Sequence, residues 1–203
     1  TSPGFSRRPL RQMSGEAEFG EMFFDDMRIP HENLVGELNR GWYVAMTGLM
    51  AERGSGGTAV VGIGGGSLGR VDSLIELAKN IKRYGKVVWE DPTFRQRIAQ
   101  FAIENEAMRW SGTRMGARQR KGQLTGDEVS IGKVFSSEMR KRRADMVMEI
   151  IGAYSQLMRG DKRAVDNGDQ VYQMLRVRGA TIEMGTSEIN RNIIAERILG
   201  LPR

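Results

Sequence analysis

The stretch Gly185–Arg203, GTSEINRNIIAERILGLPR, contains the best-delimited structural element of the chain. Isoleucines recur through it at the spacing of one helix face, at positions 189, 193, 194 and 198. A hydroxyl just before that run, from Thr186 or Ser187, can accept a free backbone N–H, as the N-cap of a helix does. Gly200 and Pro202 follow the run and are typical of a helix end. The pattern therefore predicts a capped helix that ends before Gly200.

Helical periodicity also runs through most of the chain that precedes this stretch. Apolar residues recur at helical spacing over residues 42–50, and residues 93–121 and 128–158 each carry a longer apolar stripe. A polar loop over residues 160–170 leads into a short helix predicted over residues 168–178. The two long stripes consist of Phe94, Ile98, Phe101, Met108 and Met115, and of Ile131, Phe135, Met139, Met146, Ile150 and Tyr154.

The first forty residues differ from the rest of the chain. Residues 1–16 are polar and contain two prolines, so we expect a loop there. Residues 17–29, AEFGEMFFDDMRI, are β-prone and bounded by turn signals, which predicts one or two strands. Residues 30–41 have turn residues and little periodicity and are interpreted as a connection. The sequence therefore predicts a mainly α protein with a small β piece at its front.

The composition of the 203 residues excludes several classes of protein. There are no cysteines, which excludes disulfides, thiol nucleophiles and zinc–thiolate sites, and the single His31 cannot build a histidine-rich metal site. We therefore expect no metal centre. The absence of cysteine also fits a reducing, cytoplasmic location. No run of 18 apolar residues occurs and no leader is recognisable after Thr1, so we expect no membrane span and no signal peptide.

The formal net charge is +6, and its densest source is the cluster Arg140–Arg143. A basic surface can meet nucleic acid, a membrane face or an anionic cofactor. Aromatic residues make up only 7% of the chain and do not interleave with the basic ones, so we expect no nucleic-acid partner. We interpret the cluster as the solvated face of a helix.

A glycine-rich stretch, Gly64–Gly69, supports an alternative hypothesis. Its letters, GGGSLG, match G-x-G-x-x-G. Residues 58–63 before it can form a strand, residues 70–81 after it a helix, and residues 86–90 a second strand that ends in an acid. That order is the one a dinucleotide-binding β-α-β unit requires, so a nucleotide-binding oxidoreductase is the alternative function. Surplus glycines and the lack of any later strand–helix alternation favour a small-residue helix face instead.

Three segments together resemble the acyl-CoA dehydrogenase family. Phe19–Glu37, FGEMFFDDMRIPHENLVGE, is similar to the family's last β-domain strands and their exit loop. Gly41–Arg53, GWYVAMTGLMAER, resembles the first helix of its carboxy-terminal bundle. Gly185–Arg203 resembles the family's terminal signature and is the most specific of the three matches. The resemblance covers nearly the whole chain in the family's order, and it places residues 58–80 inside a helix.

For the fold, the resemblance implies a four-helix up-down bundle at residues 39–203. A short β remnant at residues 1–38 would precede it, as the end of the family's middle β-domain and its exit loop. The amino-terminal half of a typical member would then lie outside this chain. That half closes much of the flavin and acyl site, so the chain alone can be inactive even where its parent is an enzyme.

The resemblance also implies an activity. Members of the family use FAD to desaturate an acyl-CoA thioester to a trans-2-enoyl-CoA, by removal of the α-proton and transfer of the β-hydrogen as hydride. Because the α-proton is weakly acidic, this reaction needs a placed carboxylate, a dry pocket and hydrogen bonds to the thioester oxygen. The implied partners are acyl-CoA, electron-transfer flavoprotein or a similar acceptor, and further copies of the chain in a homo-dimer or homo-tetramer.

The catalytic base is where the sequence departs from many members. They place it just before the terminal Gly-Thr, where this chain has Met184, which cannot accept a proton. Other members use a glutamate on the first bundle helix, just before an arginine, and Glu52 matches that position. The resemblance thus implies Glu52 as the base, with Arg53 and Met184 on the substrate side. A surface glutamate at 52 and a structural ion pair at Arg53 are the alternatives. The change at Met184 also leaves open a non-catalytic helical subunit of an acyl-CoA dehydrogenase complex.

Near the predicted terminal helix, Gly185, Thr186 and Glu188 are implied to bind the cofactor. A helix start offers free backbone N–H groups and the positive end of the helix dipole, which suit a polar or anionic group. A plain helix cap is the alternative interpretation of the same residues.

A second cofactor contact departs from the family. Members have an arginine ahead of an aromatic-Gly pair, and it meets the flavin pyrophosphate of a neighbouring subunit. Tyr84-Gly85 corresponds to the pair, but Ile81 stands in the place of the arginine, so Arg83 or Lys82 is the expected substitute. The family's Gln-x-x-Gly segment near the adenine corresponds here to Glu149–Gly152, again with a change.

Overall fold

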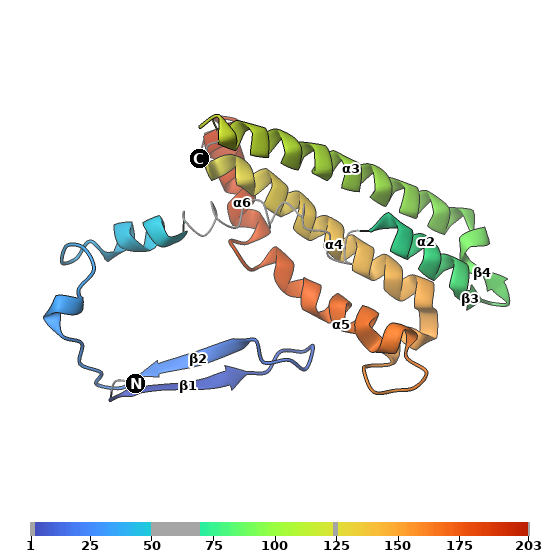
Figure 1. Ribbon diagram of the computed structural model, residues 1–203, viewed down its shortest axis with the longest axis horizontal. Helices are drawn as coiled ribbons and strands as arrows, with labels where there is room; N and C mark the ends of the chain where they lie inside the picture. Colours follow the sequence, from blue (N-terminus) through green and yellow to red (C-terminus); the bar gives the residue numbers. More distant parts are fainter. Residues whose placement is uncertain (1–2, 50–69, 124–125, 203) are drawn as a thin grey trace. The chain divides into compact units, whose positions relative to one another are not determined.

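The computed structural model describes residues 3–49, 70–123 and 126–202, drawn in Figure 1 with colours that follow the sequence. The chain divides into two compact units, Thr1–Glu52 and Arg53–Arg203. The predicted site residues Glu52 and Arg53 and the glycine motif Gly64–Gly69 lie outside the described residues. The domain boundary predicted between residues 38 and 39 stays a prediction.

The first unit contains an antiparallel hairpin of β1 (Phe5–Leu10) and β2 (Phe19–Phe24). β2 confirms the strand predicted within residues 17–29, whereas β1 shows that the loop predicted over residues 1–16 was wrong. Cross-strand pairs explain the difference. Arg8 lies opposite Glu21, with 2.5 Å between its Nε and the carboxylate, and the rings of Phe5 and Phe24 are 5.4 Å apart. Such pairs form only when both strands are present, so they cannot be predicted from the composition of one strand.

The rest of the first unit is a connection and a short helix. A 3-10 turn covers His31–Asn33, and residues 41–49 are helical, as the periodicity from Trp42 predicts. Large apolar side chains of this unit are exposed, among them Phe24 at 65% and Trp42 at 73%. A two-stranded hairpin is marginal in water by itself, so this unit contributes little stability of its own.

The second unit is a bundle of helices. Its members are α2 (Val71–Asn80), α3 (Pro92–Arg120), α4 (Val129–Ile151), α5 (Asp169–Arg176) and α6 (Ser187–Ile193), which continues as a π-helical turn over Ile194–Ile198. In Figure 1, α4 runs between α3 on one side and α5 on the other, while α6 crosses near the start of α4, and α4 contacts each of the other four helices. The predicted mainly α fold is confirmed, and α4 is its centre.

The apolar stripe predicted on α3 is confirmed in detail. Phe94, Ile98, Phe101 and Met108 are buried, and Met115 is half-buried against the same core. The helix begins as expected, because the Asp91 carboxylate accepts the backbone N–H of Thr93 at 2.8 Å. The predicted stripe therefore identifies the face of α3 that meets α4.

The stripe predicted on α4 is only half correct. Met139, Met146 and Ile150 are buried, but Ile131 and Phe135 near the start of the helix are exposed at 44% and 37%. Tyr154 lies beyond α4, in a 3-10 turn over Gly152–Gln156, and is also exposed. The first half of α4 buries a different and largely polar face, because the segment before α6 packs there. That face consists of Val129, Ser130, Gly132, Lys133, Ser136 and Ser137.

The strand arrangement needed by a nucleotide-binding β-α-β unit is contradicted. A helix does cover residues 71–80, but residues 86–90 are not a second parallel strand. β4 (Lys86–Val87) pairs antiparallel with β3 (Lys82–Arg83), and Val88–Glu90 is a 3-10 turn. Within the described ranges, both pairs of strands are antiparallel hairpins. Over the same ranges, none of the helices combines the length and the apolar character needed to cross a membrane.

Gly168 provides a test of the packing before α5. Its φ is +79°, and an added Cβ would lie 2.4 Å from the backbone nitrogen of Arg159. Gly85 has the same φ of +79°, with nothing within 4 Å of an added Cβ. We expect Gly85→Ala to lower the free energy of unfolding by about 1 kcal/mol, the cost of a left-handed alanine. Gly168→Ala should cost about 1–3 kcal/mol more, because backbone atoms must move.

Urea denaturation of both variants measures this difference. Because both glycines have the same φ, the conformational cost of alanine is the same in the two variants. The difference between their free energies of unfolding therefore measures the close approach of residue 168 to Arg159. Equal losses of stability in the two variants would show that the loop over residues 158–168 does not pack as described.

Candidate functional site

The turn that precedes α6 has an unusual backbone. Met184 and Gly185 are consecutive residues with positive φ, +57° and +86°. Glycine adopts this region freely, but a non-glycine residue such as methionine does so at a cost. Thr186 then returns to extended backbone and starts the helix. A strained residue inside a fixed turn is common at functional sites, and here it is the residue predicted to face the substrate.

Asn190 fixes this turn from inside the protein. Its side-chain amide donates to the carbonyl oxygens of Gly185 at 2.8 Å and of Thr186 at 2.9 Å. Asn190 is only 3% exposed, so both bonds are shielded from water. Asn190 is not predictable from the sequence, because an asparagine one turn into a helix has no signal of its own until the preceding turn folds back over it.

Thr186 and Glu188 form the cap of α6. The Thr186 hydroxyl oxygen accepts the backbone N–H of Ile189 at 3.2 Å, which confirms the predicted N-cap. The pKa of the Glu188 carboxyl is held below its usual range, first by its own backbone N–H and then by the Thr186 hydroxyl, which donates to it. Glu188 therefore stays ionised at the start of the helix, where a negative charge is favourable.

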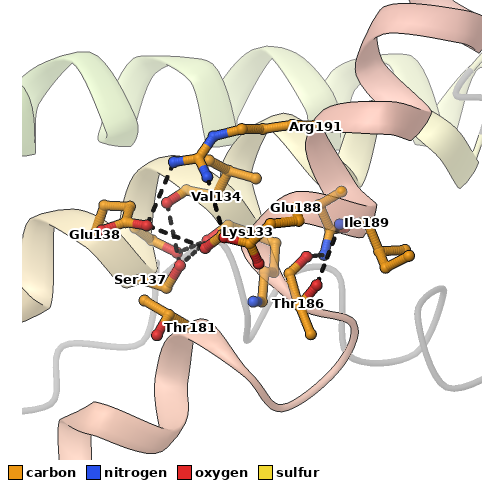
Figure 2. A network of polar contacts seen from close by, with 12 residues as sticks. Lys133, Val134, Ser137, Glu138, Thr181, Thr186, Glu188, Ile189 and Arg191 are labelled. Carbon is orange, nitrogen blue, oxygen red and sulfur yellow. Dashed lines mark hydrogen bonds and ion pairs between the residues drawn. The ribbon is translucent and has the colours of Figure 1, made fainter.

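Below the turn lies the polar face of α4, shown in Figure 2. The hydroxyl of Ser187, which is 2% exposed, lies 3.1 Å from the Glu138 carboxylate. Arg191 of α6 lies 3.4 Å from the same carboxylate and 3.7 Å from that of Glu188. Lys133 is also buried here, between Glu138 and Glu188 in the view of Figure 2. The turn is thus attached to α4 by charged and polar contacts.

Lys133 and Ser137 on this face of α4 give a weak sequence signal, the spacing of polar residues along one side of the helix. Lys133 and Ser137 lie one turn apart, and the Ser137 hydroxyl donates to the Lys133 carbonyl oxygen at 2.8 Å. Together with Ser130 and Ser136 they form a polar side on a helix whose other side is apolar. From the sequence alone, a polar side with few carboxylates is interpreted as solvent-exposed, because the segment that covers it is not known.

The predicted cofactor residue Arg83 lies near the other end of α4. Its guanidinium donates to the Glu149 carbonyl oxygen at 2.8 Å, and it lies beside Gly152. Tyr84, at the tip of the β3–β4 hairpin, is 96% exposed with a φ of +51°. The hairpin therefore presents an aromatic ring and an arginine at the surface, over the carboxy-terminal end of α4.

Glu149, near the carboxy-terminal end of α4, forms an ion pair with Arg97 of α3. Both of its carboxylate oxygens accept hydrogen bonds from Arg97, at 2.5 and 2.9 Å. These bonds hold the pKa of the Glu149 carboxyl below its usual range and raise the pKa of Arg97. Arg97 is not predictable as a member of this cluster, because 52 residues separate it from its partner in the sequence.

The two ends of α4 are far apart within one chain. Lys133 and Glu149 are 16 residues apart on one helix, which corresponds to roughly 24 Å along its axis. Met184, Gly185, Thr186 and Glu188 therefore lie together before and at the start of α6, whereas Arg83 lies elsewhere, and their roles as site residues stay predictions. One small ligand group cannot touch both ends of α4 in the same chain.

The chain matches the family described as acyl-CoA dehydrogenase, C-terminal domain, over residues 39–199. The acyl-CoA dehydrogenase IpdE1 of Mycolicibacterium smegmatis is 35% identical over 99% of this chain, and the match covers 47% of that protein. The chain thus spans about half the length of the curated relatives it matches.

Solved structures give the same result. The Tcur3481-Tcur3483 steroid ACAD is 26% identical, with a TM-score of 0.82, and the match covers all of this chain and 50% of that one. The ChsE4-ChsE5 complex from Mycobacterium tuberculosis has a TM-score of 0.77 at 23% identity, covering all of this chain and 51% of that one, and it supports the fold alone.

The cap of α6 can be tested through Thr186. We expect Thr186→Ala to lower the free energy of unfolding by about 1 kcal/mol, because the backbone N–H of Ile189 loses its acceptor. The pKa of Glu188 should rise, because one of its donors is removed. Thr186→Ser keeps the hydroxyl and should preserve both properties.

Urea denaturation and NMR titration of the glutamate side chains measure the two effects. Because a lowered carboxyl pKa stabilises the fold only above that pKa, the part of the loss due to Glu188 should vanish as the pH falls through its folded pKa. An alanine variant as stable as the serine variant would contradict the capping role.

Proposed function

We propose, because this chain belongs to the acyl-CoA dehydrogenase family, that the complete protein is a flavin-dependent acyl-CoA dehydrogenase. The observation that carries the proposal is the family match over residues 39–199, together with the preformed turn at residues 184–188. The reaction is the α,β-desaturation of an acyl-CoA thioester. Residues 1–38 are, in this proposal, the end of the middle β-domain and its exit loop.

The residues near α6 fit the cofactor implied by the family. The backbone at Gly185 carries no side chain that would prevent close approach of a flat ring, and Thr186 starts the helix beside it. Glu188 is ionised and exposed beside them. When FAD is bound, it accepts the hydride; the protein contributes the position of the reacting groups and the electric field around them.

We assign Glu52 as the base that takes the α-proton, since Met184 has no proton acceptor in the position that many members use. Arg53 and Met184 are proposed on the substrate side, with Met184 as an apolar contact. This assignment rests on the resemblance of residues 41–53 and on the side chain of Met184. A base of this kind needs a dry environment, which raises a carboxyl pKa toward the working pH.

Arg83 is proposed to bind the flavin pyrophosphate of a neighbouring subunit. The distance of roughly 24 Å along α4 supports this, because Arg83 and the turn at residues 184–188 cannot hold the same part of one ligand. A homo-dimer or homo-tetramer would place the two ends of α4 from different copies at one cofactor. Electron-transfer flavoprotein or a similar acceptor would then reoxidise the flavin.

A non-catalytic subunit of a mixed complex is the second candidate. The observation in its favour is Met184 in place of the usual base. One relative in fold is itself a complex of two named chains, ChsE4 and ChsE5. This candidate predicts that the protein binds its partner chain without reducing a flavin.

Bleaching of the flavin by an acyl-CoA in the wild-type protein separates the two candidates, and replacement of Glu52 tests the assignment of the base. In the complete protein, we expect Glu52→Gln to keep bound FAD, while the rate at which an acyl-CoA bleaches the flavin absorbance falls about 10²–10⁴-fold. Glu37→Gln, at an exposed position of the preceding loop, is the matched control and should bleach at the normal rate.

Stopped-flow absorbance at the flavin band measures the bleaching. Normal bleaching by Glu52→Gln would refute the assignment of the base. A wild-type protein that is yellow but is never bleached by any acyl-CoA would favour the non-catalytic subunit.

A further inference from the structure

Lys133 is the most unusual charged residue of the helical unit. It projects from α4 and is only 5% exposed, and its ammonium nitrogen has no hydrogen-bond partner among the described residues. A buried ammonium has three donors to satisfy, and leaving them unpaired is costly. Burial lowers the pKa of Lys133, whereas the charges of Glu183, Glu138 and Glu188 act in the opposite direction. A residue kept at such a cost calls for a role.

The carboxylates around Lys133 favour its charged form, although burial outweighs them and its pKa is lowered. Three carboxylates lie close enough to act on it, and two of them, Glu183 and Glu188, flank the turn at residues 184–187. Arginines already pair with all three: Arg176 with Glu183, and Arg191 with both Glu138 and Glu188. The cluster therefore balances three positive against three negative charges, and loss of Lys133 would leave it with a net negative charge.

The position of Lys133 connects this charge to the turn. Figure 2 shows Lys133 on α4 beside the segment that carries Thr186 and Glu188. The hydroxyl of Ser187 joins that segment to Glu138 of α4, and the amide of Asn190 donates to the carbonyl oxygen of Gly185 within it. The positive charge thus lies under the turn, shielded from water, at a place set by packing.

We propose that Lys133 is a positioning residue of the site, whose positive charge beneath the turn at residues 184–187 favours negative charge on the group bound above the turn. The inference rests on the proposed function, in which that group is the flavin of an acyl-CoA dehydrogenase. If FAD binds there, it would supply the redox chemistry, and the positive charge of Lys133 would favour the form of the cofactor that carries more negative charge. In a partly buried site a unit charge acts over roughly 10 Å with little screening, so direct contact is not required.

Removal of the charge should make the flavin harder to reduce. In the complete, FAD-loaded protein, we expect Lys133→Met to decrease the ratio of reduced to oxidised flavin about tenfold at a fixed dye potential. For a two-electron couple that factor corresponds to a shift of about 30 mV to more negative potential. Lys133→Arg keeps the charge and should retain most of the wild-type potential. Lys141→Met, on the same helix, is the matched control and should change nothing.

A purely structural role would give a different pattern. It would lower the thermal stability of Lys133→Met without moving the potential of the flavin that remains bound. Lys133→Gln is a second neutral variant with hydrogen-bonding capacity. If the methionine variant does not fold, we expect the glutamine variant to show the same shift in flavin potential.

An unchanged potential in a neutral variant that binds flavin would overturn the proposal, as would an equal shift in the arginine and methionine variants. A wild-type protein that binds no flavin would instead refute the proposed function, which is a separate result.

Discussion

The burial of a polar face of α4 beneath the turn before α6 is the constraint on which the rest of the helical unit depends. Helices in a bundle usually meet through apolar stripes, and α3 meets α4 in that way. The first half of α4 instead buries serines and Lys133. Buried polar groups are tolerated only where partners are placed accurately, so the segment over residues 183–191 has little freedom in how it docks.

This constraint explains why the site lies where it does. Ser187 and Arg191 reach Glu138 from one side, and Asn190 holds the carbonyl oxygens of the turn from within. The two contacts to Glu138 join segments about fifty residues apart in the sequence, whereas Asn190 lies four residues from Thr186. The positive φ of Met184 is therefore maintained by contacts outside the turn, as is typical of strained backbone at functional sites.

Local rules were sufficient for part of this structure. The stripe on α3, the cap at Thr186 and the strand β2 follow from periodicity, capping chemistry and β-propensity, which act over a few residues. They fail where a distant segment decides the outcome. β1 depends on its pairing with β2, and the outward position of Ile131 and Phe135 depends on α6 docking against the opposite side of α4.

The candidate site divides in the same way. Gly185, Thr186 and Glu188 were predictable because they are neighbours in the sequence and form one cap. Lys133 and Arg97 were not, because the charges that act on them come near only in the fold, and Asn190 was not, because its role depends on the turn before the helix folding back over it. Glu52 and Arg53 remain predictions.

The hairpin β1–β2 has a practical consequence for handling the protein. Among the described residues its two strands pair only with each other, and they carry exposed phenylalanines, the combination that lets one molecule add its strand to another. The helical unit, in contrast, contains the buried clusters around Ile150 and Ala144. Self-association in solution should therefore depend on the first forty residues, and thermal stability on the helical unit.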